Sequence, residues 1–261
     1  MTALVKNRLS IVLIAMAMLA PSLAAEEAET PETALDKALA LAQEGSAQAQ
    51  YDLGVMYELG EDAPEDHEEA VRWYARAAEQ NHVEAQCNLA YMYLSGRGVP
   101  EDGAEAVNWY QRAADRGFVT AQFNLGVIYN QGHGVPRDDE AALQWFLKAT
   151  EQNHAGAQYN IGAMYAMGYG VPKDDAEALK WYLRAAEQGH VSAQFNLGVM
   201  YLKGEGVPRD YIMAYKWFNL AGTRDQVAAD LRDTVDARMT PEQISEAQRL
   251  SREFYAAMGT R

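Results

Sequence analysis

The five tryptophans of this chain stand at a constant interval of 36 residues, and this spacing restricts the possible folds more than any other feature. They are Trp73, Trp109, Trp145, Trp181 and Trp217. An alanine and a tyrosine keep the same interval, as Ala49, Ala85, Ala121, Ala157 and Ala193, and as Tyr57, Tyr93, Tyr129, Tyr165 and Tyr201. A fixed interval of this length is typical of an array in which each repeat packs on the next one. The sequence therefore predicts a solenoid of five repeats.

Each repeat carries the pattern of two helices. In the fifth repeat, Ala193, Leu197 and Tyr201 form an apolar stripe with helical spacing, and a Gly-x-Gly segment then supplies the left-handed residue that ends a helix. An aspartate follows two residues after a repeated proline and is placed to cap the second helix; these residues are Asp66, Asp102, Asp138, Asp174 and Asp210. A glutamate three residues further on predicts a reciprocal capping box, at Glu69, Glu105 and Glu177.

The repeated segments resemble a known family. AQFNLGVMYLKGEGVPRD in the fifth repeat and GAQYNIGAMYAMGYGVPKD in the fourth are typical of the Sel-one-like repeat (SLR) family, which is similar to tetratricopeptide repeats. The resemblance covers residues 46–222. It implies an all-α fold, a right-handed superhelical solenoid of helix-turn-helix repeats with helical caps at both ends. It also implies a role as an adaptor or scaffold.

The start of the chain has the pattern of a secretory signal. Lys6 and Arg8 precede the apolar run Ile11 to Ala20, and small residues end at Ala24. We expect a signal peptide over 1–24 and a periplasmic or secreted protein; the alternative is an uncleaved anchor helix. A cap helix is expected within 25–45, the repeats over 46–81, 82–117, 118–153, 154–189 and 190–222, and a two-helix cap over 223–261. Val227, Leu231 and Val235 predict the buried face of the first cap helix.

Charge and cysteine content exclude several classes of function. The formal net charge is −15, which would repel the phosphate backbone of a nucleic acid. A single cysteine, Cys87, allows no internal disulfide and no cysteine-based zinc site. We expect Cys87 to be an inert apolar residue, with pairing to another molecule as the alternative.

No pattern of catalytic, cofactor-binding or metal-binding residues stands out. The Gly-x-Gly segments follow helices rather than strands, so they are not dinucleotide loops. His82, His154 and His190 share one repeat position, but neighbouring repeats are too far apart for one metal, so we expect turn residues. A branch of SLR relatives is linked to β-lactam hydrolysis, but the paired cysteines of that branch are missing here.

A second set of apolar residues lies on the opposite side of the first helix in each repeat. In a helix-pair superhelix this side lines the inner curve, which predicts a groove for a partner peptide or domain. The candidate residues are Tyr51, Val55, Cys87, Tyr91, Phe123, Val127, Tyr159, Ala163, Phe195 and Val199. The alternative is that each ring packs on the next repeat. A repeated glutamine beside them, Gln50 in the first repeat, is expected to bond to neighbouring turns, with an amide ladder that reads a peptide as the alternative.

These patterns favour an exported, non-enzymatic adaptor that binds another protein in this groove, in envelope signalling or regulation. A scaffold for polysaccharide export or cell-wall assembly and, last, a β-lactam-linked hydrolase are the alternatives. We expect no cofactor and no membrane insertion after signal cleavage.

Overall fold

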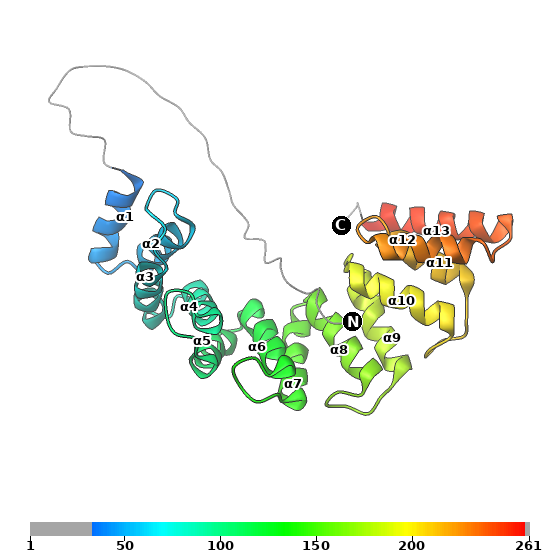
Figure 1. Cartoon of the computed structure of the whole chain (residues 1–261), viewed down its shortest axis with the longest axis horizontal. Coiled ribbons are helices and arrows are strands. Elements are labelled where there is room, and N and C mark those ends of the chain that lie inside the picture. The colour runs from blue at the N-terminus through cyan, green and yellow to red at the C-terminus, as the bar shows by residue number, and fades with distance from the viewer. Residues whose placement is uncertain (1–32, 259–261) are drawn as a thin grey trace, which may run out of the picture. The chain divides into compact units, whose positions relative to one another are not determined.

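The computed structural model describes residues 33–258 of the 261-residue chain. This part contains thirteen α-helices and no strand (Figure 1), which confirms the all-α fold class. The signal peptide predicted over 1–24 lies outside the described residues.

The helices form five consecutive pairs with one helix before them and two after them (Figure 1). The first helices of the pairs are α2 (Ala47–Leu59), α4 (Val83–Ser95), α6 (Val119–Gln131), α8 (Ala155–Met167) and α10 (Val191–Lys203). The second helices are α3 (His67–Glu79), α5 (Gly103–Asp115), α7 (Asp139–Glu151), α9 (Asp175–Ala186) and α11 (Tyr211–Ala221). The flanking helices are α1 (Ala34–Gln43), α12 (Gln226–Asp236) and α13 (Pro241–Met258).

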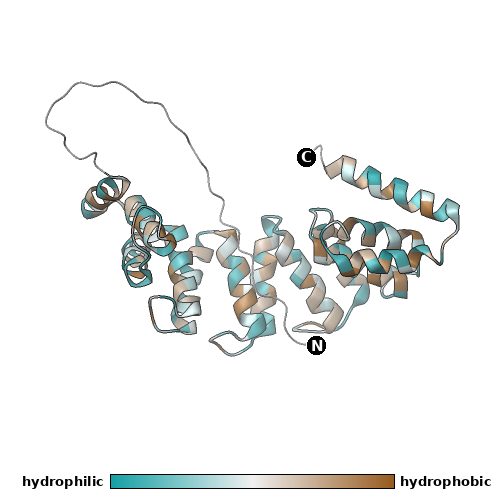
Figure 2. Ribbon diagram, turned by 45° about the horizontal axis from the view of Figure 1, so that its top comes forward, coloured by the Kyte–Doolittle hydropathy of each residue, from teal (hydrophilic) through white to brown (hydrophobic). Residues whose placement is uncertain are grey.

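Packing runs mainly between helices that are neighbours in the chain. The two helices of a pair pack most extensively on each other, and each second helix also packs on the first helix of the next pair. Polar and apolar residues share every helix (Figure 2), as expected when each helix buries one face. Nearest-neighbour packing of this kind defines a solenoid.

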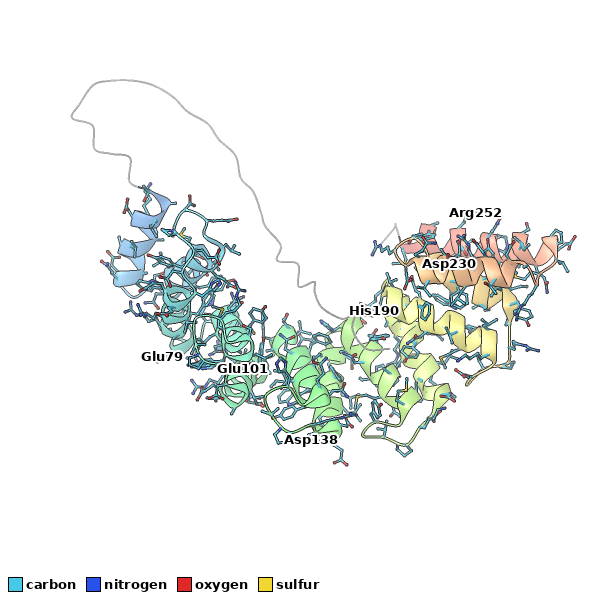
Figure 3. All side chains as sticks on the ribbon, viewed as in Figure 1. Glu79, Glu101, Asp138, His190, Asp230 and Arg252 are labelled. Atoms are coloured by element: carbon cyan, nitrogen blue, oxygen red, sulfur yellow. The ribbon has the colours of Figure 1, made fainter. Side chains whose placement is uncertain are left out.

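The helix ends follow the predicted signals, with one exception. The side chain of Asp66 accepts the backbone N–H groups of Glu68 and Glu69, at 3.0 Å each. An aspartate side chain caps each of the other second helices by accepting one or two backbone N–H groups, including Asp138 at the start of α7 (Figure 3). The reciprocal half of the capping box is wrong. The N–H of Asp66 instead donates to the carbonyl of Tyr57 at 2.8 Å, and Glu69 pairs with Arg72.

The second glycine of the loop between the helices of a pair has a function that its sequence position does not reveal. Gly206 has φ 68°, and a Cβ built on it would lie 2.4 Å from the carbonyl oxygen of Asp175, at the start of α9 in the preceding pair. Gly98 and Gly170 approach the preceding second helix in the same way. Each of these loops therefore lies directly on the backbone of the repeat before it.

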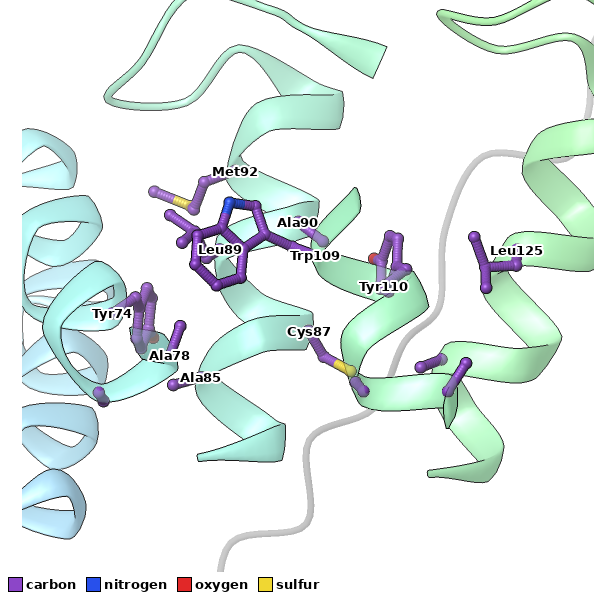
Figure 4. Close-up of a cluster of buried hydrophobic side chains, with 14 of the residues drawn as sticks. Tyr74, Ala78, Ala85, Cys87, Leu89, Ala90, Met92, Trp109, Tyr110 and Leu125 are labelled. Carbon is purple, nitrogen blue, oxygen red and sulfur yellow. The ribbon is translucent and has the colours of Figure 1, made fainter. Parts of the chain in front are cut away.

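The repeated tryptophans lie in the core of the pairs. Trp109 lies beside Leu89 and Met92 of α4 (Figure 4), and is only 9% exposed. Trp181 is half-buried, and the other four are buried. A cation lies over the tryptophan face in each of the five pairs, as Arg112 does at 4.4 Å from the ring centroid of Trp109. The tryptophans are therefore core residues, Trp181 less completely than the other four.

The flanking helices cover the two ends of the array. α1 buries Ala38 and Ala42 against α2. At the other end α12 and α13 both pack on α11, and Phe254 meets Trp217 at 5.4 Å between ring centroids. The face predicted for α12 is partly wrong, because Val227 is 59% exposed and Ala228 takes the inward position, seven residues before Val235.

Candidate partner-binding site

Four of the five aromatic residues proposed for the groove, Tyr51, Phe123, Tyr159 and Phe195, are half-buried. Tyr51, Phe123 and Tyr159 each stack on the histidine that begins the next first helix, with 4.5 to 4.7 Å between ring centroids. The partners are His82, His154 and His190, the last of which is labelled at the start of α10 in Figure 3. The rings therefore act as contacts between repeats and expose only part of their surface.

The same rings also contact the second helix of their own pair. Phe123 lies 5.9 Å from Phe146, and Phe195 lies 5.9 Å from Phe218, between ring centroids. Tilted and edge-to-face aromatic pairs at such distances stabilise a fold beyond the area they bury. Replacing Phe123 or Phe195 would thus weaken the packing of the repeats as well as any binding of a partner. These residues are therefore poor sites for a binding test.

The structure makes Cys87 unsuitable as a contact for a partner. It occupies the aromatic position in the second repeat but is only 8% exposed and lies in the buried cluster of Figure 4. Burial raises the pKa of its thiol to about 12, so the thiolate form is scarce at neutral pH. The thiol is therefore inert, as the sequence favours.

The remaining candidates stand four residues after the first set on each first helix, and one of them is exposed. Val55, Val127, Ala163 and Val199 are half-buried, and Tyr91 of α4 is 38% exposed. Together with the free edges of the rings they form an apolar line along the first helices, which we call the first-helix line. Tyr91 is its most accessible member.

The histidines at the repeated position cap the first helices. The Nδ1 atoms of His82, His154 and His190 accept the backbone N–H groups of Ala85, Ala157 and Ala193 at 3.1 to 3.3 Å. Ser46 performs this role in the first repeat, and Phe118 in the third provides no side-chain cap. Within residues 33–258, no group of three or more His, Cys, Asp or Glu side chains is arranged to hold a metal ion.

The capping histidines predict a pH dependence of stability. Burial lowers the pKa of His154 and His190 below the usual value of about 6.5. The unfolded chain then takes up more protons, so stability is lost as the pH falls below about 6.5. We expect the double variant His154→Ser, His190→Ser to lose less stability than the wild type between about pH 7.5 and about pH 5.5, because serine caps without titrating.

Thermal unfolding at a series of pH values measures this difference. The control is His133→Ser, because the His133 side chain is half exposed in a loop. A double variant that keeps the full pH dependence of the wild type would contradict the role assigned to His154 and His190.

The repeated glutamines form a buried hydrogen-bond network. Gln50 donates from Nε2 to the carbonyl of Ala42 at 3.0 Å and accepts a hydrogen bond from Nε2 of Gln80 at 2.7 Å. Gln122 and Gln158 accept equivalent bonds from Gln152 and Gln188. The prediction that these amides bond to neighbouring turns is confirmed, and since they are buried they are not available to read a peptide.

One place in this network lacks its donor. Arg116 stands in the second repeat where Gln80 stands in the first, and the buried Oε1 of Gln86 has no hydrogen-bond partner among the described residues. We expect Arg116→Gln to supply the donor and to raise the free energy of unfolding by about 1 kcal/mol. Urea unfolding measures the change, with Arg116→Ala as the control that removes the cation without adding an amide. Equal stability of the two variants would contradict the expectation.

Two clefts were not predicted. They lie beside the turns that follow the second helices, which we call the turn side of the array. One, of about 330 Å³, lies between the end of α7 and the end of α9, and the other, of about 390 Å³, lies one repeat further on and is bordered by α13. The signal that could have located them is a comparison of turn residues across the repeats, because the residues lining the second cleft depart from the repeat pattern. None of the described helices is long and apolar enough to cross a membrane.

Comparison with known proteins agrees with this architecture. The model of the Sel1 repeat family matches residues 47–82, 83–118, 119–154, 155–190 and 191–225, units that begin one residue later than predicted. The structure is similar to a protective antigen present in uropathogenic Escherichia coli strains, described as displaying an SLR fold, with 36% identity and a TM-score of 0.73. That match covers 82% of this chain and 46% of the other, so this chain spans about half the length of the E. coli protein.

A Sel1 repeat protein from Oxalobacter formigenes is also similar, with 28% identity and a TM-score of 0.68 over 85% of this chain and 92% of that one. No curated protein matches significantly. Sel1 repeat proteins are generally protein-interaction adaptors and typically lack enzymatic activity. With five matched units over most of its described length, this chain belongs to the Sel1 repeat family.

Proposed function

We propose that this chain is an exported, non-enzymatic adaptor that binds a peptide segment or a domain of another protein along the first-helix line, in envelope signalling or regulation. The observation that carries the proposal is the exposed Tyr91, with half-buried apolar residues at the equivalent positions of the other first helices. Partly exposed tyrosine offers much contact area at little loss of side-chain entropy.

The packing of the rings supports this role. Because Tyr51, Phe123 and Tyr159 are held by the next repeat, their exposed edges are already fixed before a partner arrives. A preorganised surface loses less conformational entropy on binding than a flexible one. The histidine stacking therefore favours binding as well as folding.

The charge of the chain restricts the partner. A net charge of −15 favours a partner whose flanks are basic or neutral and disfavours acidic partners. Export to the periplasm rests on the signal pattern, and the mature chain is then expected to begin at Ala25. Sequencing the N-terminus of protein isolated from the periplasm tests this, and a retained Met1 would contradict it.

Paired tyrosine variants test the binding surface. Tyr91 is 38% exposed on a first helix, and Tyr169 is 44% exposed in the loop after α8, away from the line. We expect Tyr91→Ala to weaken the binding of envelope proteins that copurify with the wild type by about tenfold, and Tyr169→Ala to leave it unchanged. Equal retention of the partner by both variants would contradict the proposal.

A further inference from the structure

The two clefts on the turn side are equivalent positions in successive repeats. Asn153, Gln158 and Arg184 line the first, and Gly189, Gln194 and Leu220 occupy the corresponding places, 36 residues later, in the second. Because the repeat keeps the backbone at these positions constant, the two clefts differ in the side chains there and in α13, which borders only the second. We call the second one the terminal cleft.

Three side chains of the terminal cleft depart from the repeat. Leu220 replaces the cation Arg184, Thr223 replaces the acid Glu187, and Arg224 replaces the amide Gln188. The acid is present at this position in all four earlier repeats, as Glu79, Asp115, Glu151 and Glu187. Compared with the first cleft, the terminal cleft therefore has no carboxylate among its described lining residues, and its guanidinium group stands at the position of Gln188 and no longer at that of Arg184.

Arg224 is the one charged side chain among the described residues that line the terminal cleft. Among the described residues, no carboxylate lies within ion-pairing distance of it, although the chain as a whole carries a charge of −15. Asp225 follows Arg224 in the chain, but its carboxylate accepts the backbone N–H groups of Val227 and Ala228 as the cap of α12. The terminal cleft thus presents an exposed arginine that forms no ion pair with the described residues.

The rest of the terminal cleft combines apolar residues with the polar side chains of Gln188, Gln194 and Thr223, and the last helix borders it. Val191, Leu220 and Met258 line it, and Tyr255 of α13 donates a hydrogen bond from its hydroxyl to the carbonyl of Leu220 at 3.2 Å. This bond holds α13 against the end of α11 and fixes one wall. A volume of about 390 Å³ is at the lower end of the range for small-ligand sites.

We propose that the terminal cleft binds the free carboxylate end of a peptide chain whose last residue is apolar. A carboxylate pairs with an arginine through two parallel hydrogen bonds, and Arg224 is free to make them. The apolar last side chain would lie against Val191, Leu220 and Met258. This site is separate from the first-helix line, so it goes beyond the adaptor function proposed above and can fail or hold independently of it.

A pair of peptides tests the proposal on the full chain. The probe is a fluorescein-labelled Gly-Ser-Gly-Leu-Leu peptide with a free carboxylate, compared by fluorescence anisotropy with the same peptide ending in an amide. We expect the peptide with the free carboxylate to bind at least about tenfold more tightly than the amide, because a hydrogen bond to a charged group contributes enough free energy for such a difference in affinity. Equal affinity of acid and amide, or no binding of either, would overturn the proposal.

Matched arginine variants locate the site. Arg224→Gln restores the amide found at Gln188, and we expect it to abolish the preference for the acid, whereas Arg116→Gln at the same repeat position should preserve it. Thr223→Glu, which restores the acid of the earlier repeats and keeps Arg224, should abolish the preference as well. Retention of the preference in both terminal-cleft variants would overturn the assignment.

A small acid distinguishes the two sources of such a carboxylate. Isobutyrate carries the charge and a small apolar group but no peptide chain, and it should not displace the labelled peptide at concentrations where the unlabelled peptide does. Displacement at equal concentrations would mean that the cleft binds free carboxylic acids, and would overturn the assignment to a peptide end.

Discussion

Replacing Trp109 by alanine lowers the free energy of unfolding by about 3 to 5 kcal/mol, the usual range for removing a buried aromatic ring. The ring lies between the two helices of the second pair, beside Leu89 and Met92 (Figure 4), and Arg112 covers its remaining face. No neighbouring side chain can fill such a space without moving a helix, so the cavity term adds to the lost apolar contact. Urea unfolding followed by circular dichroism measures the loss.

Tyr91→Ala is the control for this experiment. Tyr91 lies on α4, the first helix of the same pair, but is 38% exposed, so we expect a loss of less than about 1 kcal/mol. Losses of similar size at Trp109 and Tyr91 would contradict the assignment of the repeated tryptophans to the core.

The second large effect is expected at the loop that contacts the preceding repeat. Gly206→Ala should lower the free energy of unfolding by about 3 kcal/mol, because the methyl group meets a left-handed backbone and a neighbouring carbonyl group at once. A Cβ there would lie 2.4 Å from the backbone of Asp175, which belongs to another helix and cannot rotate away as a side chain can.

Gly117→Ala separates the two causes. Gly117 also has a positive φ, 82°, but a Cβ on it would have no atom within 4 Å outside its own neighbours. We expect a loss of about 1 kcal/mol at this position, from the left-handed backbone alone. If urea unfolding gives equal losses for the two variants, the contact between the loop and the preceding repeat contributes nothing.

The periodic part of the fold could be predicted because its signals are local. The helix ends at Gly96 and Asp102 depend on residues within one turn of the chain, and the tryptophan interval fixes the number of repeats. The contact of Gly206 with Asp175 joins positions in two successive pairs, so no local pattern contains it. The hydrogen bond of the Asp66 N–H could not be predicted for a related reason. Its acceptor is the carbonyl of Tyr57, at the other end of the loop between the two helices.

The sequence did not predict how the candidate residues pack. The helical angle predicts Tyr51 and Phe195 on the side opposite the pair contact, yet each ring lies 5.9 Å from an aromatic ring in the second helix of its own pair. Whether the two rings are exposed depends on the distance to the next repeat, which the sequence of a single helix does not determine. The stacking of Tyr51 on His82 favours the alternative in which the rings pack between repeats, and leaves Tyr91 as the accessible position.

The terminal cleft shows what a repeat sequence contains and what it omits. The replacement of Glu187 and Gln188 by Thr223 and Arg224 is visible once the repeats are aligned. That these two residues face a cleft became evident only from the position of α13, which lies beyond the periodic region and carries Tyr255 and Met258. Within an array, departures from the repeat are therefore the natural places to look for binding chemistry.

Hydrogen–deuterium exchange of the chain with and without its copurified partner tests the central claim, that a partner binds along the first helices. The account predicts slower exchange on binding in peptides from α4, α6 and α8, with little change in α3, α5 and α7. Protection confined to the second helices or to the flanking helices α1, α12 and α13 would contradict it.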